Sequence, residues 1–221
     1  IGEDGIVYMK NNAIFSEYLH EEDQKEIVEG WLSLGDHGYL DELGHLHILD
    51  RQEDVITNTD GEIIYPRLVE NELKSSPYIQ EAVCFGKDKP YMTAILNIDM
   101  NSVGRWADKN RILYTEYSDL SRNPKVVELI EQQVEQLMSK LSPQNRVKKF
   151  SILHKQFTAD QGELTRTLKI RRNFVEQKYK ILLDGMYSDT QEVSLTSSQM
   201  ESVEEEVSLR VIQLKIEQGV A

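Results

Sequence analysis

The sequence predicts an α+β fold, in which a small mixed sheet with flanking helices follows a small β unit. Three observations support this prediction. Short apolar runs divided by glycines fill the first 50 residues, segments with strand and helix patterns alternate from residue 51 to about 186, and a polar, acidic tail covers 187–221. Because 221 residues can bury one good core or two small ones, we expect one domain plus smaller pieces.

Residues 1–50 have the pattern of a β hairpin unit. Gly35, Gly38 and Gly44 divide this stretch, and Leu46 and Ile48 alternate with polar residues as in a half-buried hairpin. The first residues lack a basic region followed by an apolar stretch, and the sequence does not begin with Met. We therefore expect the first residue to mark a boundary within a longer protein.

Residues 51–186 have the pattern of a compact α+β domain. Two short strands flank an Asp-Gly turn at Asp60 and Gly61, and Pro66 opens a helix. The runs EAVCFG and YMTAILNID are the clearest strands, and the second is apolar enough to be central in a sheet. A helix with one apolar face is expected at 124–141, a last strand at 150–153 and a last core helix at 172–183.

The tail, 187–221, begins with a polar stretch that resembles a linker. Met200, Val203, Val207, Val211 and Leu214 then recur three and four residues apart, which predicts an amphipathic helix. We expect this helix to pack on its own domain. A dimer contact through a short coiled coil is the alternative.

Composition and charge exclude some partners. A net charge of -13 argues against nucleic acid, whose binding depends on Lys and Arg neutralising phosphates. Residues 146–180 depart from this average, with ten Lys and Arg against three acids, a balance of +7. Such a segment suits either a phosphorylated small molecule or an ordinary solvated face. No apolar run approaches the roughly 20 residues that span a bilayer. The single cysteine, Cys84, cannot form an internal disulfide, so we expect a cytoplasmic protein, with peripheral membrane attachment as the alternative.

Several standard catalytic motifs are absent from the sequence. It has no GxxxxGK[ST], GxGxxG or HExxH motif and no cysteine cluster, which disfavours an autonomous nucleotidase or metalloenzyme. His45 and His47 share one face of the expected strand, but a metal would need a third ligand. We interpret the pair as structural and predict no metal site. Cys84, in the apolar run AVCF, is expected to be a buried small hydrophobe and not a nucleophile.

Two stretches carry a resemblance to a known family. GWLSLGDHGYLDELGHLHILDRQEDVI at 30–56 resembles the adenylate-forming superfamily signature GW-x-x-TGD-x-G-x-x-D-x-x-G-x-L-x-I-x-DR-x-x-D-x-I. GELTRTLKIRR at 162–172 is similar to the motif GELTPTLKxxR that ends the long-chain acyl-CoA synthetases. The intervening PYIQEAVCFG and KPYMTAIL are similar as well, so the resemblance covers about residues 1–185. It identifies the chain as the C-terminal part of an AMP-forming acyl-CoA synthetase. The resemblance implies that residues 1–50 are the end of the large N-terminal domain and that 51–186 are the mobile lid domain.

The resemblance implies a two-step reaction. A fatty carboxylate attacks the α-phosphate of ATP to give acyl-AMP and pyrophosphate, and the thiol of CoA then displaces AMP. ATP and magnesium would be bound mainly by an N-terminal domain outside this chain, with CoA as co-substrate. The expected partners are therefore the fatty acid, ATP, CoA and that N-terminal domain, and we expect the fragment to be inactive by itself.

The resemblance also assigns roles to individual residues. Lys169 matches the motif's lysine, which stabilises the charge that develops in the first step. Asp36 matches the carboxylate that accepts hydrogen bonds from the ribose hydroxyls, and Arg51 matches the arginine that contacts the same ribose. Glu53 stands where the family has the hinge about which the small domain turns.

The sequence departs from the family pattern at three places. Leu34 replaces a threonine, Arg166 replaces a proline, and Asp60-Gly61-Glu62 stands where the family has Gly-Gly-Lys in the loop lining the CoA tunnel. A side chain at Asp60 would crowd the pantetheine arm, since a glycine there lets the backbone approach it. Two alternatives to a CoA ligase follow: a fatty acyl-AMP ligase without the CoA step, or a degenerate non-catalytic binding module.

Overall fold

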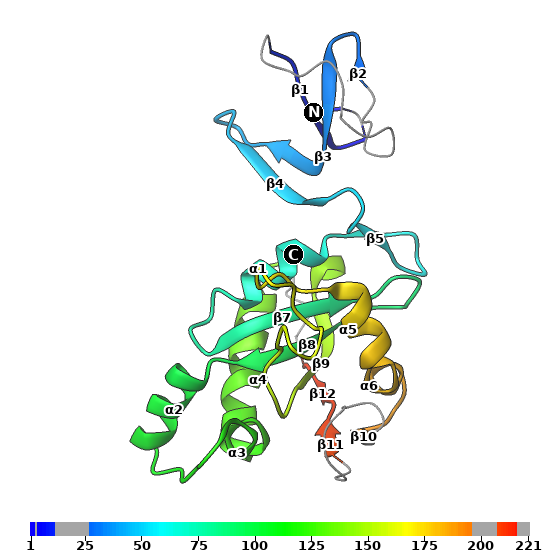
Figure 1. Cartoon of the computed structure of the whole chain (residues 1–221). Coiled ribbons are helices and arrows are strands. Elements are labelled where there is room, and N and C mark those ends of the chain that lie inside the picture. Colours follow the sequence, from blue (N-terminus) through cyan, green and yellow to red (C-terminus); the bar gives the residue numbers. More distant parts are fainter. Residues whose placement is uncertain (3, 12–26, 196–206, 216–221) are drawn as a thin grey trace. The chain divides into compact units, whose positions relative to one another are not determined.

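The computed structural model describes residues 1–2, 4–11, 27–195 and 207–215. The chain divides into a first unit, Ile1–Val55, and a second unit, Ile56–Ala221 (Figure 1). The division falls shortly after the junction expected at residue 50. Every helix in the described part of the chain is too short or too polar to cross a membrane.

The first unit is an antiparallel sheet built around one long strand. Its described strands are β1 (Ile6–Met9), β2 (Ile27–Val28), β3 (Trp31–Leu40) and β4 (Leu46–Arg51). β3 pairs with each of the other three. Glu29 and Gly30 close the β2–β3 hairpin with φ angles of 51° and 81°, the two positive values that a type I′ turn requires.

The β3–β4 pair has a close backbone approach at Gly38. A Cβ atom on Gly38 would lie 2.5 Å from the carbonyl oxygen of His47, so only glycine fits without a shift of the backbone. The register is irregular between His37 and Gly38, and on the far side of this bulge Asp36 pairs with Arg51. The bulge therefore sets which side chains of the predicted ribose site lie opposite each other.

The second unit is organised around a mixed sheet, as predicted. Its strands are β7 (Ile79–Phe85), β8 (Met92–Ile98), β9 (Val147–Ile152) and β12 (Ile212–Gln213), in the order β12-β9-β8-β7. β8 is parallel to β9, and the other two pairings are antiparallel. All seven residues of β8 are buried, which confirms the prediction that this apolar run is central. A short hairpin, β5 (Ile56–Thr57) and β6 (Ile63–Ile64), precedes the sheet.

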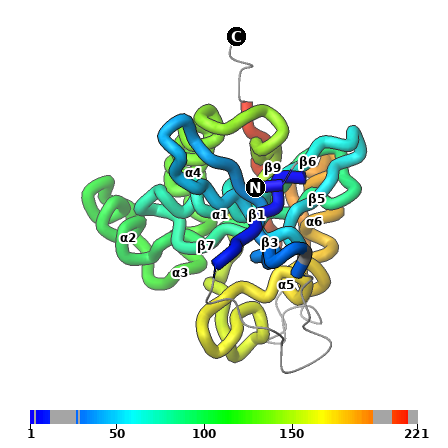
Figure 2. Tube along the Cα trace, turned by 90° about the horizontal axis from the view of Figure 1, so that it is seen from above, coloured from blue at the N-terminus to red at the C-terminus, as the bar shows by residue number. Residues whose placement is uncertain are grey.

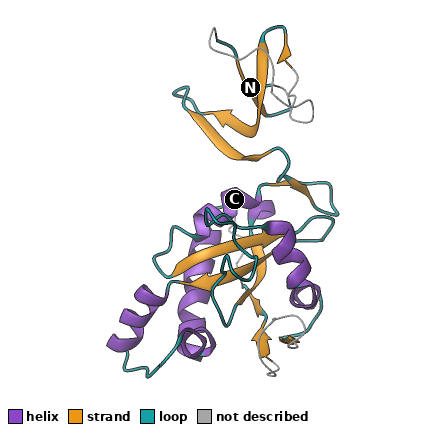
Figure 3. Cartoon of the chain, in the orientation of Figure 1, coloured by secondary structure: helices purple, strands orange, loops and turns teal. Residues whose placement is uncertain are grey.

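Helices cover both faces of this sheet (Figure 3). Figures 1 and 2 place one group on the side opposite α5 (Arg172–Lys178) and α6 (Lys180–Met186): α1 (Pro66–Leu73), α2 (Met100–Lys109), α3 (Tyr117–Arg122) and α4 (Pro124–Met138). A 3₁₀ turn, η2 (Pro143–Asn145), leads into β9. Successive side chains of β7 point to opposite faces of the sheet and so enter two different cores. Ala82 and Cys84 lie in the core under α1 and α4, whereas Val83 and Phe85 lie in the core under α5 and α6.

The prediction of an amphipathic helix in the tail is wrong for the residues of that segment that the structure describes. β10 (Glu192–Leu195) and β11 (Val207–Arg210) form an antiparallel hairpin, and β12 pairs with β9. Val207, Leu209 and Val211 are buried in the second unit's own core, so burial follows a period of two rather than the helical period. Met200 and Val203 lie outside the described residues. A coiled-coil dimer would need exposed apolar side chains, but Val207, Val211 and Leu214 are buried within this chain.

Candidate functional site

The β3–β4 pair brings together Asp36 and Arg51, the two residues predicted to bind ribose. The Nε atom of Arg51 lies 3.1 Å from Oδ1 of Asp36, and its Nη1 donates to the carbonyl oxygen of Leu34 at 3.4 Å. The Arg51 side chain is 45% exposed and that of Asp36 is 19% exposed. The pair therefore presents a carboxylate that is already oriented and accepts hydrogen bonds only, which suits it chemically to a diol.

The histidine pair predicted to be structural lies at the far end of the same hairpin. His45 Nδ1 and His47 Nε2 lie 3.1 Å and 3.0 Å from the same oxygen, Oδ2 of Asp41. The hydrogen bond from His47, followed by that from the His45 backbone, holds the pKa of Asp41 at about 2. The Tyr39 ring stacks on His47 at 4.9 Å. Among the residues that the structure describes, no group of three or more His, Cys, Asp or Glu side chains is arranged to hold a metal ion.

Glu53, the predicted hinge residue, lies in an exposed turn after β4. The amides of Asp54 and Val55 both donate to the carbonyl oxygen of Arg51, at 3.0 Å and 3.1 Å. The division of the chain into two units falls directly after Val55. The turn that contains Glu53 is therefore the last local structure of the first unit.

The loop predicted to line the CoA tunnel is the connection between β5 and β6. The side-chain oxygen of Asn58 accepts the amides of Asp60 at 3.0 Å and Glu62 at 2.8 Å, and these bonds shape the loop. Gly61 has φ +81°, and a Cβ atom built on it would meet no atom within 4 Å. Asp60 and Gly61 are both exposed, so the loop leaves its tip open to a ligand.

The GELTRTLKIRR motif folds into a small hairpin. Leu164 and Ile170 form a β-bridge, and the Thr165 amide donates to the Lys169 carbonyl oxygen at 2.8 Å. The Lys169 amide in turn donates to Oγ1 of Thr165 at 3.0 Å, and Leu168 takes a positive φ of 60° to close the loop. Lys169 is exposed. The motif therefore presents its lysine on an exposed loop with a fixed backbone.

A buried carboxylate lies at the base of this hairpin. Glu163 is fully buried, and Lys155 Nζ and Lys178 Nζ lie 2.5 Å and 3.1 Å from its Oε1. The Tyr179 hydroxyl donates to Oε1 at 2.8 Å, and the Thr158 amide donates to Oε2 at 3.0 Å. Burial by itself raises the pKa of Glu163, but the bonds from Lys155 and Thr158 outweigh it and hold the pKa below its ordinary value.

The end of the motif is tied to the sheet by a second ion pair, which is partly buried. Arg172 donates to Glu70 through two parallel bonds, Nη1 to Oε1 at 2.6 Å and Nη2 to Oε2 at 3.0 Å. Arg172 Nη1 also donates to the Cys84 carbonyl oxygen at 2.7 Å, and the Cys84 amide donates to Glu70 Oε1 at 2.8 Å. The pair joins α5, α1 and β7, which is a structural role for the last arginine of the motif.

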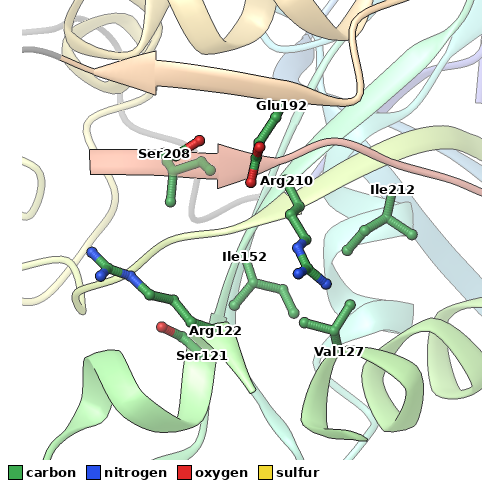
Figure 4. A pocket seen from close by; sticks show the side chains of 9 residues that line it. Ser121, Arg122, Val127, Ile152, Glu192, Ser208, Arg210 and Ile212 are labelled. Atoms are coloured by element: carbon green, nitrogen blue, oxygen red, sulfur yellow. The ribbon is translucent and has the colours of Figure 1, made fainter. Parts of the chain in front are cut away.

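A cavity of about 370 Å³ opens elsewhere in the second unit, between α3, α4 and the β10–β11 hairpin. Figure 4 shows Arg122 and Arg210 beside it, with Ile152 between them and Val127 next to the Arg210 guanidinium. None of the predicted site residues lines this cavity. The predicted residues are instead divided between the units: Asp36, Arg51 and Glu53 belong to the first, and Asp60, Gly61 and Lys169 to the second.

Three residues of the candidate site were not expected from the sequence: Glu163, Asn58 and Glu70. The only signal for Glu163 was its place inside the matched motif, because its lysine partners lie 8 and 15 positions away in the sequence. Asn58 comes just before the Asp60-Gly61 turn, and Asn or Asp side chains at such positions commonly accept hydrogen bonds from backbone amides of the turn. Glu70 carried no sequence signal, since its arginine partner is 102 residues away.

Comparison with known proteins assigns the second unit to a family. The family model for the AMP-binding enzyme C-terminal domain matches residues 53–191. Long-chain-fatty-acid--CoA ligase FadD15 of Mycobacterium tuberculosis is 31% identical over 191 residues, which cover 85% of this chain and 32% of the relative. Long-chain-fatty-acid--CoA ligase ACSBG2 of Rattus norvegicus is 30% identical over 205 residues, covering 83% and 31%. The chain thus spans about a third of the length of the curated relatives it matches.

The fold is also found among solved structures. The adenylation domain of a carboxylate reductase from Mycobacterium chelonae superposes with a TM-score of 0.56 at 21% sequence identity, covering 72% of this chain and 23% of that one. At this identity the likeness establishes the fold alone. It agrees with the mixed sheet and flanking helices that the sequence predicts.

Proposed function

The chain belongs to the family of AMP-binding enzyme C-terminal domains, and on this premise we propose that it is the C-terminal part of a long-chain fatty acid CoA ligase. The observation that carries the proposal is Lys169, exposed on an ordered hairpin inside the family domain. The relatives named as long-chain ligases are similar over most of this chain, which supports the substrate class.

The proposed reaction has two steps. The fatty carboxylate attacks the α-phosphorus of ATP, forming a carbon–oxygen–phosphorus anhydride and releasing pyrophosphate. The CoA thiol then attacks the acyl carbon, loses its proton and displaces AMP. ATP and CoA are the substrates that adenylate-forming ligases use in general. Magnesium would be bound mainly by an N-terminal domain outside this chain.

Lys169 would act in the first step. As carboxylate and phosphate combine, negative charge builds up on oxygens that water cannot reach well, and a positioned ammonium group stabilises that charge. Removing one such preorganised donor costs on the order of a hundredfold to a thousandfold in rate. The exposure of Lys169 supports this role, because the side chain is available to a nucleotide that other parts of the protein hold.

Asp36 and Arg51 would hold the ribose of the nucleotide. With Oδ1 oriented by Arg51 Nε at 3.1 Å, the Asp36 carboxylate is ready to accept hydrogen bonds from both hydroxyls of a diol. Glu53 would be the hinge about which the second unit turns between the two steps. Its place in an exposed turn, two residues before the boundary between the units, supports this assignment.

The loop containing Asp60 and Gly61 would guide the pantetheine arm of CoA. The open space above Gly61 supports such an approach. The exposed Asp60 side chain at the same tip favours a second candidate, a fatty acyl-AMP ligase that hands its acyl group to another acceptor. The proposal also includes an N-terminal domain as the main partner and a cytoplasmic location, with peripheral attachment to a membrane as the alternative.

The test uses the full-length parent protein. Fatty-acid-dependent exchange of labelled pyrophosphate into ATP reports the first step, and CoA-dependent release of AMP in the same samples reports the second. A CoA ligase shows both. Exchange without CoA-driven turnover indicates the acyl-AMP ligase, and replacing Asp60 with glycine should then increase AMP release. Absence of exchange with every fatty acid refutes the proposal and leaves a non-catalytic binding module.

A further inference from the structure

The carboxylate of Glu163 is the meeting point of the segments that support the Lys169 hairpin. Two ammonium groups reach its Oε1 atom, from Lys155 just after β9 and from Lys178 in α5, and the Lys178 side chain is only 8% exposed. Tyr179, at the break between α5 and α6, donates to the same oxygen at 2.8 Å. A buried carboxylate is costly unless it is paired and hydrogen-bonded, so this arrangement holds only when all the segments are in place.

The backbone on either side of Glu163 connects this cluster to the hairpin. The Arg171 amide donates to the Glu163 carbonyl oxygen at 2.9 Å, and the Leu164 amide donates to the Thr158 carbonyl oxygen at 3.1 Å. These bonds fix both strands of the hairpin at its base, whereas the hydrogen bonds described for residues 165–169 run within the hairpin itself. The direction in which the hairpin points is therefore set at Glu163.

Ångström-scale placement matters for a catalytic group on a loop. A misplacement of about 1 Å can cost about a hundredfold in rate, even when the change lies far from the reacting atoms. An exposed loop is ordinarily among the more mobile parts of a protein. The cluster beneath this hairpin supplies a rigid base at the one place where the second unit presents its predicted catalytic lysine.

We propose that Glu163, held by Lys155, Lys178 and Tyr179, is the positioning residue that places Lys169 for acyl-adenylate formation. The inference rests on the proposed function of Lys169. Glu163 itself is buried and does not touch the substrates; it acts through the hairpin. Its removal should therefore impair only the step in which Lys169 acts.

The experiment compares Glu163→Gln with two reference variants in the full-length protein. Lys169→Ala measures the whole contribution of the lysine. Asp184→Asn makes the same carboxylate-to-amide change in an exposed ion pair with Lys180 on α6, away from the hairpin. Each protein is assayed for fatty-acid-dependent pyrophosphate exchange and, separately, for thioester formation from CoA and supplied acyl-adenylate.

For Glu163→Gln we expect the turnover number for adenylation to fall by about tenfold to a hundredfold, with the KM for ATP and the thioester rate unchanged. Asp184→Asn should match the wild type in both assays. Equal losses in both steps, or no loss in adenylation while Lys169→Ala loses it, would overturn the positioning role. Normal adenylation by Lys169→Ala would instead overturn the proposed function on which the inference rests.

A second variant covers the case in which Glu163→Gln does not fold. Tyr179→Phe removes one hydrogen bond to Oε1 and leaves both lysine contacts with the carboxylate in place. It should lower adenylation severalfold and spare the thioester step. An unchanged adenylation rate in folded Tyr179→Phe, with Lys169→Ala impaired, would count against the inference.

Discussion

Replacing Arg172 with methionine is expected to destabilise the second unit by about 3 kcal/mol. The substitution removes a guanidinium group that pairs with the Glu70 carboxylate and keeps an unbranched apolar side chain of similar length. Breaking a buried ion pair by removing one partner costs about 3–5 kcal/mol, because the remaining charge stays in a poorly solvated site.

The structure puts the expected value at the lower end of that range. The Glu70 side chain is 10% exposed and that of Arg172 is 23% exposed, so water partly screens the pair. Glu70 would keep the hydrogen bond from the Cys84 amide at 2.8 Å, while the Cys84 carbonyl oxygen would lose its bond from Arg172. Removing both charges should be much less harmful, since well-packed apolar replacements of buried ion pairs are often neutral.

Urea denaturation of the 221-residue chain at pH 7 measures these differences. Arg105→Met, on the exposed side of α2, is the matched control and should change the free energy of unfolding by less than about 0.5 kcal/mol. The double variant Glu70→Met/Arg172→Met should recover most of the stability that Arg172→Met loses. A loss below about 1 kcal/mol for Arg172→Met, or a double variant no more stable than the single one, would refute the reasoning.

Two further predictions concern the second unit. Burial, followed by the charges of Arg122 and Lys155, lowers the pKa of His154 from 6.5 to about 4, so the unfolded state binds a proton that the folded state does not. The free energy of unfolding should therefore fall by about 1–2 kcal/mol as the pH drops from 7 to 5, a value that allows for solvent screening of the partly exposed ring. In urea titrations, His154→Gln should make the free energy of unfolding less dependent on pH. Leu209→Ala should lower the free energy of unfolding by about 2–5 kcal/mol in the same assay, because the Leu209 side chain is buried in the core under α5 and α6. A decrease of less than about 1 kcal/mol would contradict that packing.

Much of the second unit could be predicted from local sequence pattern. The apolar run in β8 is buried on both faces, and Pro66 and Pro124 open α1 and α4 as expected. The predicted single helix at 172–183 is divided at Tyr179, where the hydroxyl group turns to the buried Glu163. Such a break depends on a contact between segments, and the apolar spacing of the helix does not reveal it.

The tail shows why spacing alone can mislead. Val207, Val211 and Leu214 fit a helical period, but Leu209 between them is also buried, and the edge of β9 offers β12 a pairing partner. β-branched valines favour the extended backbone once such an edge is available. The sequence did not predict α2 and α3. Their buried side chains pack against the sheet in the same core, a contact that local sequence pattern does not reveal.

The sequence motifs nominate individual site residues, but they do not show which side chains contact one another. Asp36 and Arg51 were each assigned from the motif, and the strand register then explains why they meet. Glu163 and Glu70 have their principal partners in other segments of the chain, so no local pattern could have identified them.

The most direct test of the central claim is the rate of fatty-acid-dependent pyrophosphate exchange in the full-length protein carrying Lys169→Ala. Lys109→Ala, which removes an exposed lysine from the end of α2, is the control. The account predicts exchange reduced about a hundredfold to a thousandfold in Lys169→Ala and unchanged in Lys109→Ala. Exchange at the wild-type rate in Lys169→Ala would contradict it.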